Sequence, residues 1–257
     1  MTLISHEVPK SLFSHHGLIS DYPYVLGHLL KLDSEYEKFY RRMMKTSSFS
    51  ILDNSCFELN GNSISNSELS SLIGEYKPSH YILPDVLHNK EATLQRSTQF
   101  LNTYRKLDKE ATPIGVLQGK TFEELGDCFH WYRGRGITYI AIPFDPLPDS
   151  HYGVSRYLVF RELFYSIKSQ SVDIHFLGCD NPSELLLYSG EEVDYITSID
   201  TSSPIITGWN GIRYGEYGYN GSKPKEKLAE NLDISLSSNQ IEDISYNIKK
   251  FRSYLLR

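Results

Sequence analysis

Features that would place this chain of 257 residues in a special class are largely missing from its sequence. Its three cysteines, at positions 56, 128 and 179, form no C-x-x-C pair, which argues against a disulfide framework and a local zinc site. No apolar run approaches the ~20 residues of a membrane-spanning helix. Residues 1–10 lack the basic and then apolar layout of a signal peptide. We therefore expect a cytoplasmic protein without a membrane partner.

An excess of positive charge is also missing, because the formal net charge is −6. Any contact with nucleic acid must therefore come from local groups. No G-x-G-x-x-G follows a predicted strand, which weakens a dinucleotide-binding hypothesis. The length and the hydrophobic content of 40% instead fit one large α/β domain that covers residues 1–257.

Short apolar segments alternate with helical patterns between residues 49 and 200. Six strands are predicted, within residues 49–52, 80–86, 113–119, 137–143, 173–178 and 193–200. This alternation is typical of parallel strands joined by helical crossovers. An early strand at residues 2–4 and a last one at residues 204–207 bring the number to eight. We predict a (β/α)₈ TIM barrel, with an open doubly wound sheet as the alternative.

Apolar residues at helical spacing predict the connecting helices. These cover residues 26–45, 66–76, 91–107, 122–133, 152–168 and 182–189, and a closing amphipathic helix covers residues 241–256. Residues 11–27 have the composition of a loop. Residues 207–221 mix glycine with aromatics and precede Lys223, Lys225 and Lys227. That mixture suits either a base-stacking loop that touches phosphate or a plain surface loop.

Three predicted strands end at an aspartate and a fourth ends at a glutamine. The aspartates are Asp53, Asp85 and Asp200, and the glutamine is Gln118. In a parallel barrel the carboxyl ends of the strands converge on one mouth, so we expect these side chains to share a pocket. Mutual repulsion there raises the pKa of at least one carboxylate. A turn cap explains any single aspartate equally well, but it is the weaker explanation for the whole set.

Four short segments, taken in order, resemble the motifs of one enzyme family. Residues 53–58 are similar to D-[SG]-G-[GA]-F-[QE], and residues 117–119 are similar to V-Q-G. Residues 176–185 resemble L-M-G-V-G-x-P-x-[DE]-L, and residues 199–204 resemble F-D-x-x-x-P. The family is that of the tRNA-guanine transglycosylases, and the likeness is closer to their phage-borne DNA relatives of the DpdA type.

The chain also departs from the family pattern. The tRNA enzymes carry a C-x-C-x-x-C…H zinc subdomain after the nucleophile, whereas this chain has no cysteine after Cys179. Ser55 and Cys56 replace a double glycine, and residues 142–145 replace a glycine-rich loop. The resemblance therefore implies a barrel that lacks the zinc-binding subdomain, as in the phage DNA branch, and needs neither metal nor cofactor.

The resemblance implies two catalytic residues. Asp200 is the expected nucleophile, which attacks C1′ to give a covalent glycosyl-enzyme. Asp53 is the expected general acid and base for the departing guanine and the incoming base.

The resemblance also implies a set of substrate-binding residues. Asp85 is expected to accept hydrogen bonds from N1–H and the 2-amino group of guanine. Gln118, helped by the backbone of Gly119, is expected to donate to O6. Phe57 is expected to stack on the ring, worth ~1–3 kcal/mol. Gly178 belongs to the matched stretch and is expected to contact the substrate.

The implied partners are a guanine in DNA and a free 7-deazaguanine base such as the 7-cyano derivative, preQ0. The target base must leave the duplex stack, and its replacement would protect phage DNA from restriction. Two alternatives stay open at this point. One keeps the chemistry but acts on tRNA, in the queuosine or archaeosine manner, and the other is an inert barrel that binds nucleic acid or a purine. The sequence does not decide the oligomeric state.

Overall fold

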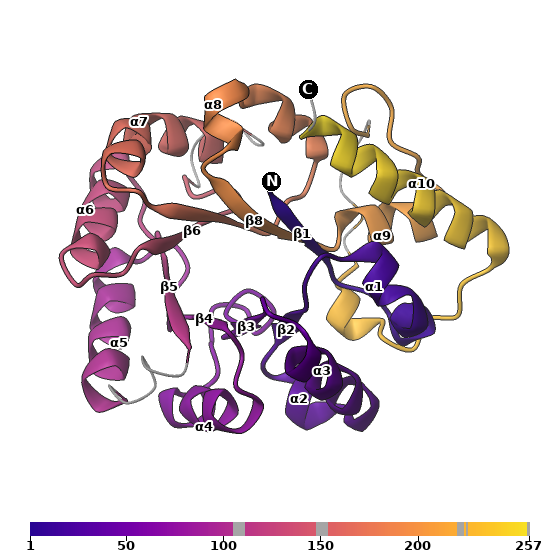
Figure 1. The fold of residues 1–257 in the computed structure, drawn as a ribbon, viewed down its shortest axis with the longest axis horizontal. Coiled ribbons are helices and arrows are strands. Elements are labelled where there is room, and N and C mark those ends of the chain that lie inside the picture. The colour runs from indigo at the N-terminus through magenta and orange to yellow at the C-terminus, as the bar shows by residue number, and fades with distance from the viewer. Residues whose placement is uncertain (105–110, 148–153, 220–223, 225, 256–257) are drawn as a thin grey trace.

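The computed structural model describes residues 1–104, 111–147, 154–219, 224 and 226–255, and its sheet has eight parallel strands. The strands are β1 (Leu3–His6), β2 (Tyr24–Leu26), β3 (Ile51–Asp53), β4 (His80–Ile82), β5 (Thr112–Val116), β6 (Tyr139–Pro143), β7 (Asp173–Leu177) and β8 (Ile196–Thr201). Their order in the sheet is β1-β8-β7-β6-β5-β4-β3-β2, and helices surround them (Figure 1). The predicted (β/α)₈ TIM barrel is confirmed.

The barrel closes between β1 and β2 through a side chain rather than a backbone ladder. The hydroxyl of Ser5 donates to the carbonyl of Tyr22 at 2.8 Å and accepts from the amide of Tyr24 at 3.2 Å. The amide of Asp21 donates to the carbonyl of Ile4 at 2.8 Å. These contacts satisfy polar groups at the edges of β1 and β2 that would otherwise be exposed.

An outer layer of helices covers the strands. The helices are η1 (Lys10–His15), α1 (His16–Ile19), α2 (Leu29–Leu32), α3 (Ser34–Thr46), α4 (Asn66–Tyr76), α5 (Lys90–Thr103), α6 (Phe122–Arg133), α7 (Ser155–Ser169), η3 (Pro182–Leu187), α8 (Gly190–Val193), α9 (Ser203–Trp209), η4 (Leu228–Glu230) and α10 (Ser238–Tyr254). Several begin at a side-chain cap, such as Asp33 for α3, Ser65 for α4, Asn89 for α5 and Thr121 for α6. These caps satisfy free amides of the first turn and so set where each crossover helix starts.

The six predicted strands between residues 49 and 200 correspond to β3 through β8. The expected strand at residues 204–207 is wrong, because this segment lies in α9, where Pro204 occupies the first turn and its fixed φ suits a helix start. The eighth strand is instead β2, inside the segment expected to be a loop. The predicted helix at 26–45 is correspondingly shorter and is divided by Asp33 into α2 and α3. Parts of the helices expected at 91–107 and 152–168 fall outside the described residues.

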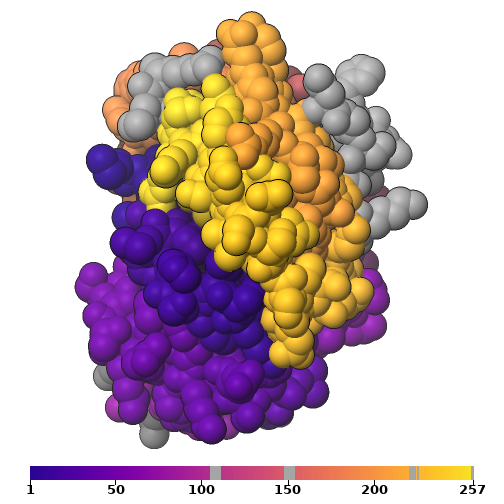
Figure 2. Space-filling model, turned by 90° about the vertical axis from the view of Figure 1, so that its right-hand side faces the viewer, coloured from indigo at the N-terminus to yellow at the C-terminus, as the bar shows by residue number. Residues whose placement is uncertain are grey.

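The C-terminal helix α10 lies across the N-terminal part of the chain (Figure 2). The guanidinium of Arg252 donates to the carboxylate of Asp21 at 2.9 Å and to the carbonyl of Ile19 at 3.1 Å. On its inner side, Phe251 packs edge-on against His6, with ring centroids 5.6 Å apart. Helix α10 therefore holds down the segment that leads from β1 to β2, where the barrel closes.

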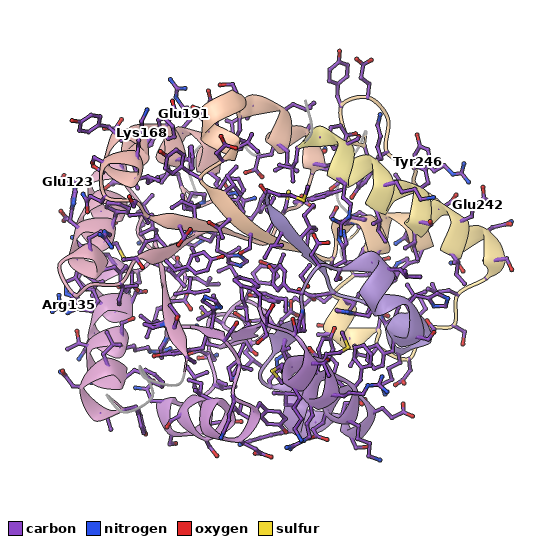
Figure 3. The ribbon with its side chains drawn as sticks, viewed as in Figure 1. Glu123, Arg135, Lys168, Glu191, Glu242 and Tyr246 are labelled. Atoms are coloured by element: carbon purple, nitrogen blue, oxygen red, sulfur yellow. The ribbon has the colours of Figure 1, made fainter. Side chains whose placement is uncertain are left out.

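Charged side chains such as Glu123 of α6 and Glu242 of α10 project outward from the helices (Figure 3). The strands carry the apolar core, in which Ile51, Ile140 and Ile174 are fully buried. Within the described part of the chain, no helix combines the length and the apolar character needed to cross a membrane.

Burial of His16 makes the folded state less stable at low pH. The residue is buried, and its ring meets Phe39 and Tyr40 edge-on at 5.5 and 5.8 Å. Burial lowers the pKa of His16 to about 4. In the unfolded chain the pKa is near 6.5, so stability is lost as the pH falls from about 6.5 toward 4. We expect His16→Phe to change the free energy of unfolding, relative to the wild type, by about 2 kcal/mol more in the stabilising direction at pH 5 than at pH 8.

Urea unfolding of the variant and the wild type at both pH values checks this expectation. His15→Phe is the matched control, because the neighbouring side chain is exposed and should show no such dependence on pH. Equal pH dependence in all three proteins would contradict the assignment.

Candidate functional site

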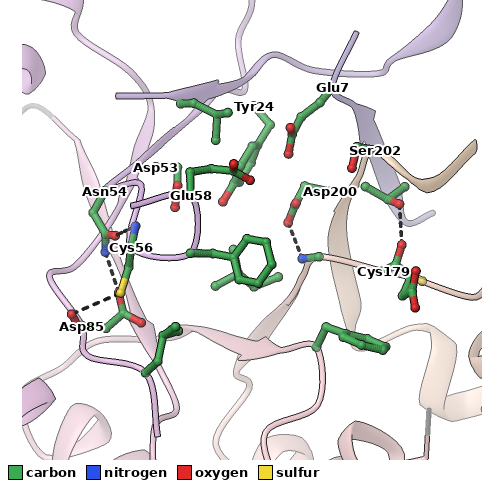
Figure 4. A pocket seen from close by; sticks show the side chains of 18 of the residues that line it. Glu7, Tyr24, Asp53, Asn54, Cys56, Glu58, Asp85, Cys179, Asp200 and Ser202 are labelled. Carbon is green, nitrogen blue, oxygen red and sulfur yellow. Dashed lines mark hydrogen bonds between the residues drawn. The ribbon is translucent and has the colours of Figure 1, made fainter. Parts of the chain in front are cut away.

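A pocket lies at the carboxyl ends of the strands, and all eight strands contribute to it, either directly or through the loops that follow them (Figure 4). Its lining includes Glu7 after β1, Tyr24 of β2, Asp53 of β3, Asp85 after β4, Gln118 after β5, Phe144 after β6, Gly178 after β7 and Asp200 of β8. Its volume of about 150 Å³ matches that of a cavity that holds one benzene ring, and it opens to solvent. The pocket therefore suits a planar ring that enters from outside.

Asp53 caps a tight turn and faces the pocket at the same time. Its Oδ2 atom accepts from the amide of Ser55 at 2.8 Å, and the side chain of Asn54 accepts from the amide of Cys56 at 2.8 Å. Ser55 adopts a positive φ of 63°, a conformation that short polar residues tolerate in turns. The turn-cap explanation and the active-site explanation of Asp53 are thus both compatible with its position.

Burial controls the protonation of Asp53. The side chain has little contact with water, and burial raises its pKa to about 7. The amide of Ser55 and the hydroxyl of Tyr24 oppose this rise, while the charges of Asp85 and Asp200 reinforce it. Near neutral pH the carboxyl group can therefore give or take a proton, as a general acid or base requires.

Asp85 is held between two amide side chains. Asn54 donates to its Oδ1 at 2.8 Å and Gln118 donates to its Oδ2 at 2.6 Å. The carbonyl oxygen of Gln118 accepts from the amide of His88 at 2.8 Å, which fixes the orientation of the Gln118 side chain. Burial raises the pKa of Asp85, and both amides counteract it. Each oxygen of Asp85 keeps a further acceptor position, and Gln118 keeps a second N–H for a ligand.

Asp200 is positioned by the loop after β7. The amide of Gly178 donates to Oδ1 of Asp200 at 2.9 Å. Gly178 has a φ of +68°, in the left-handed region where a side chain costs about 1–2 kcal/mol. Its carbonyl accepts from Arg156 at 2.6 Å, and Arg156 is itself buried in a two-point pair with Glu184 at 2.6 and 2.7 Å. This pair holds the loop that aims the amide of Gly178 at Asp200.

Phe57 forms an exposed part of the pocket rim. Its side chain is 63% exposed, although the residue lines the pocket. The amino group of Lys227 lies 5.3 Å above the ring and also donates to the carbonyl of Glu58 at 3.4 Å. An exposed ring beside a cation is a suitable surface for stacking a base near phosphate.

Six of the seven residues predicted to bind substrate or catalyse line this pocket, namely Asp200, Asp53, Asp85, Gln118, Phe57 and Gly178. Gly119 does not line it. A β-carbon at Gly119 would lie 2.8 Å from Cβ of Glu124, at the start of α6. The structure therefore explains this glycine by close packing against the helix.

The pocket also contains residues that the sequence reasoning missed. Glu7 follows β1 and Asn54 follows Asp53, and both line the pocket. Tyr24 lies between Asp53 and Asp200 in Figure 4, and its ring stacks on His175 with centroids 5.8 Å apart. Glu7 repeats the pattern of an acid at a strand end, and Tyr24 lies in a short apolar run after a proline. Both signals were present in the sequence.

The aromatic loop at residues 207–221 is mostly part of the core. Trp209, Tyr214 and Tyr219 are buried, so their rings cannot stack an incoming base, whereas Tyr217 is exposed. The hydroxyl of Tyr219 donates to Asp180, which lines the pocket, at 3.0 Å. The prediction of a base-stacking loop is thus wrong for these three rings. Residues 220–221 and the lysines at 223 and 225 lie outside the described residues.

Among the described residues, no group of three or more histidine, cysteine, aspartate or glutamate side chains is arranged to hold a metal ion. The three cysteines are buried and unpaired. No protein-family model matches the chain, and no curated protein matches it.

The raised pKa of Asp53 makes the stability of the protein depend on pH. The folded state keeps the proton up to about pH 7, whereas an unfolded aspartate loses it near pH 4. Stability therefore falls as the pH rises from about 4 to 7, by an amount on the order of 4 kcal/mol. We expect Asp53→Asn to remove this loss and to be more stable than the wild type at pH 8.

Urea unfolding at pH 4.5 and pH 8 measures the difference. Asp127→Asn, at an exposed position on α6, serves as the control and should leave the pH dependence unchanged. A wild type that is as stable as Asp53→Asn at pH 8 would contradict a buried, protonated Asp53.

Proposed function

We propose that this chain is a base-exchange transglycosylase, which replaces guanine in DNA by a 7-deazaguanine through a covalent bond to Asp200. The observation that carries the proposal is the meeting of Asp53, Asp85, Gln118 and Asp200 in one pocket. These residues come from four strand ends spread over 148 positions (200 − 53 + 1) of the chain. The same residues carry the motif resemblance to the guanine transglycosylases.

Asp53 and Asp200 differ in a way that suits one as the general acid and base and the other as the nucleophile. The pKa of Asp53 is raised to about 7, so it can exchange a proton with the base near neutral pH. Asp200 receives the amide of Gly178 on Oδ1, and the described residues offer its Oδ2 no hydrogen-bond donor. The Oδ2 atom is therefore the oxygen available to attack C1′.

The reaction divides into two balanced displacements. In the first, Oδ2 of Asp200 bonds to C1′ while the C1′–N9 bond breaks, and the departing guanine takes a proton from Asp53. In the second, Asp53 takes the N9 proton of the incoming base. N9 then attacks C1′, and Asp200 leaves as a carboxylate.

The guanine base would be recognised mainly by Asp85, which is held by two amide side chains. The two oxygens of Asp85 can accept the N1–H and the 2-amino group of a guanine edge, and the free N–H of Gln118 can donate to O6. Adenine presents a different pattern at these positions and would leave the buried groups unpaired, which is costly. Phe57 would cover the ring at the mouth of the pocket.

DNA is the favoured substrate because the motifs resemble those of the phage branch and because no cysteine follows Cys179. In a phage setting, the exchanged base would protect the DNA from restriction. A duplex must release the target base before it can reach a buried pocket, at a cost of a few kcal/mol. A base already displaced from the stack should therefore react faster.

The direct test incubates the protein with labelled guanine and with duplex DNA, single-stranded DNA or tRNA, and then measures the label in the polymer. We expect uptake into DNA and displacement of that label by 7-cyano-7-deazaguanine. Uptake into tRNA alone would assign the tRNA reaction instead. Tight binding without exchange on every polymer would leave an inert barrel and would overturn the proposal.

Asp200→Asn tests the nucleophile. The variant should lose exchange by about 10³-fold or more, because an amide cannot replace the attacking carboxylate. Asp173→Asn is the matched control, since this aspartate begins β7 at the opposite end of the barrel and pairs with Thr197. Exchange by Asp200→Asn at close to the wild-type rate would remove Asp200 from the mechanism.

A further inference from the structure

A row of buried polar side chains in contact with one another runs through the barrel and ends at Asp200. The hydroxyls of Tyr139 and Ser198 lie 2.6 Å apart, and Oγ of Ser198 lies 2.7 Å from Nδ1 of His175. The other ring nitrogen of His175, Nε2, lies 3.0 Å from Oδ1 of Asp200. This contact is not a hydrogen bond, and Nε2 has no other partner among the described residues. Asp200 is thus the group that this nitrogen faces.

A local irregularity in the sheet brings these residues together. Between β7 and β8 the register shifts, so that Ile174 pairs with Ile196 but His175 pairs with Ser198. Side chains alternate along a strand, so Ser198 and Asp200 share the inner face of β8. Register irregularities of this kind often re-aim side chains beside active sites. The shift places His175 next to both Ser198 and Asp200.

The ring of His175 is fixed from a third direction. Tyr24 stacks on it with an interplanar angle of 21°, and the hydroxyl of the same tyrosine opposes the rise in the pKa of Asp53. His175 is fully buried, as is Ser198. Tyr24 therefore links the surroundings of the two acids that the proposed reaction uses.

The hydrogen-bond donors and acceptors in this row of side chains favour one placement of the protons on them. An ionised Asp200 can only accept, so the nitrogen that faces it carries the proton. With the ring proton on Nε2, Nδ1 accepts from Ser198, and Ser198 in turn accepts from Tyr139. Burial keeps the hydroxyl of Tyr139 protonated by raising its pKa. Each of these groups then has a consistent donor or acceptor role.

We propose that His175 is the positioning residue for Asp200, with its Nε2 facing Oδ1 at 3.0 Å so that Oδ2 points to the substrate. This inference rests on the proposed function, since it assigns how the nucleophile of that reaction is held. The ring nitrogen that faces Asp200 gives its carboxyl group a polar contact among neighbouring acids. It also stabilises the carboxylate when Asp200 leaves in the second displacement.

The kinetic test compares His175→Phe, His175→Gln and the wild type in the guanine-exchange assay. Phenylalanine removes the polar nitrogen that faces Oδ1 and should lower kcat by about 10- to 100-fold with little change in KM, the size expected for a lost polar contact to a charged group. Glutamine can place an N–H near the same point and should recover part of kcat. Ser198→Ala, a smaller change that frees Nδ1, should lower kcat less. His16→Phe, a buried histidine outside the barrel interior, is the control.

A spectroscopic test does not depend on activity. Nitrogen-15 NMR of the histidine rings should show His175 with the proton on Nε2 in the wild type, and Ser198→Ala should weaken this preference. A proton on Nδ1 in the wild type, or a kcat unchanged in both His175→Phe and Ser198→Ala, would overturn the assignment. A wild type that exchanges no base would instead refute the proposed function, while the NMR result would still decide the position of the proton.

Discussion

Burial of several carboxylates in one pocket is the constraint on which the rest of this site depends. Each acid removed from water must find donors, or it keeps its proton. Asp85 obtains two amide side chains and Asp200 obtains a backbone amide. Asp53 has the amide of Ser55 and the hydroxyl of Tyr24, but these do not offset its burial, so its pKa rises to about 7. Different donors thus give chemically similar side chains different surroundings.

The barrel supplies these donors from segments that are distant in the sequence. Parallel strands bring their carboxyl ends to one mouth, so an amide after β5 can meet an acid after β4. The loop after β7 needs a glycine with positive φ at Gly178, and the buried pair of Arg156 and Glu184 holds it. Removing either partner of such a pair would leave an unpaired buried charge, which is strongly destabilising. The residues that position the site are therefore also residues that the fold needs.

The sequence predicted most of the fold because the strands between residues 49 and 200 are apolar, short and regularly spaced. It predicted the acids of the site because three strands end in aspartate. It failed at β2, because these three residues lie inside a segment whose composition is that of a loop. With β2 it missed Tyr24, and it missed the role of His175 because a register shift between two strands has no local sequence signal. Neither a base-stacking loop nor a plain surface loop describes Trp209, Tyr214 and Tyr219, because composition alone does not tell buried aromatics from exposed ones.

The central claim is that an ionised Asp200 attacks the sugar of a guanine nucleotide. The most direct measurement mixes the protein with a guanine-containing oligonucleotide in the absence of any incoming base, denatures it, and maps covalent adducts by mass spectrometry. The account predicts a protein–DNA adduct on the peptide that contains Asp200, with release of free guanine and loss of the adduct when a 7-deazaguanine is added. Release of guanine without an adduct, or an adduct on another residue, would contradict it.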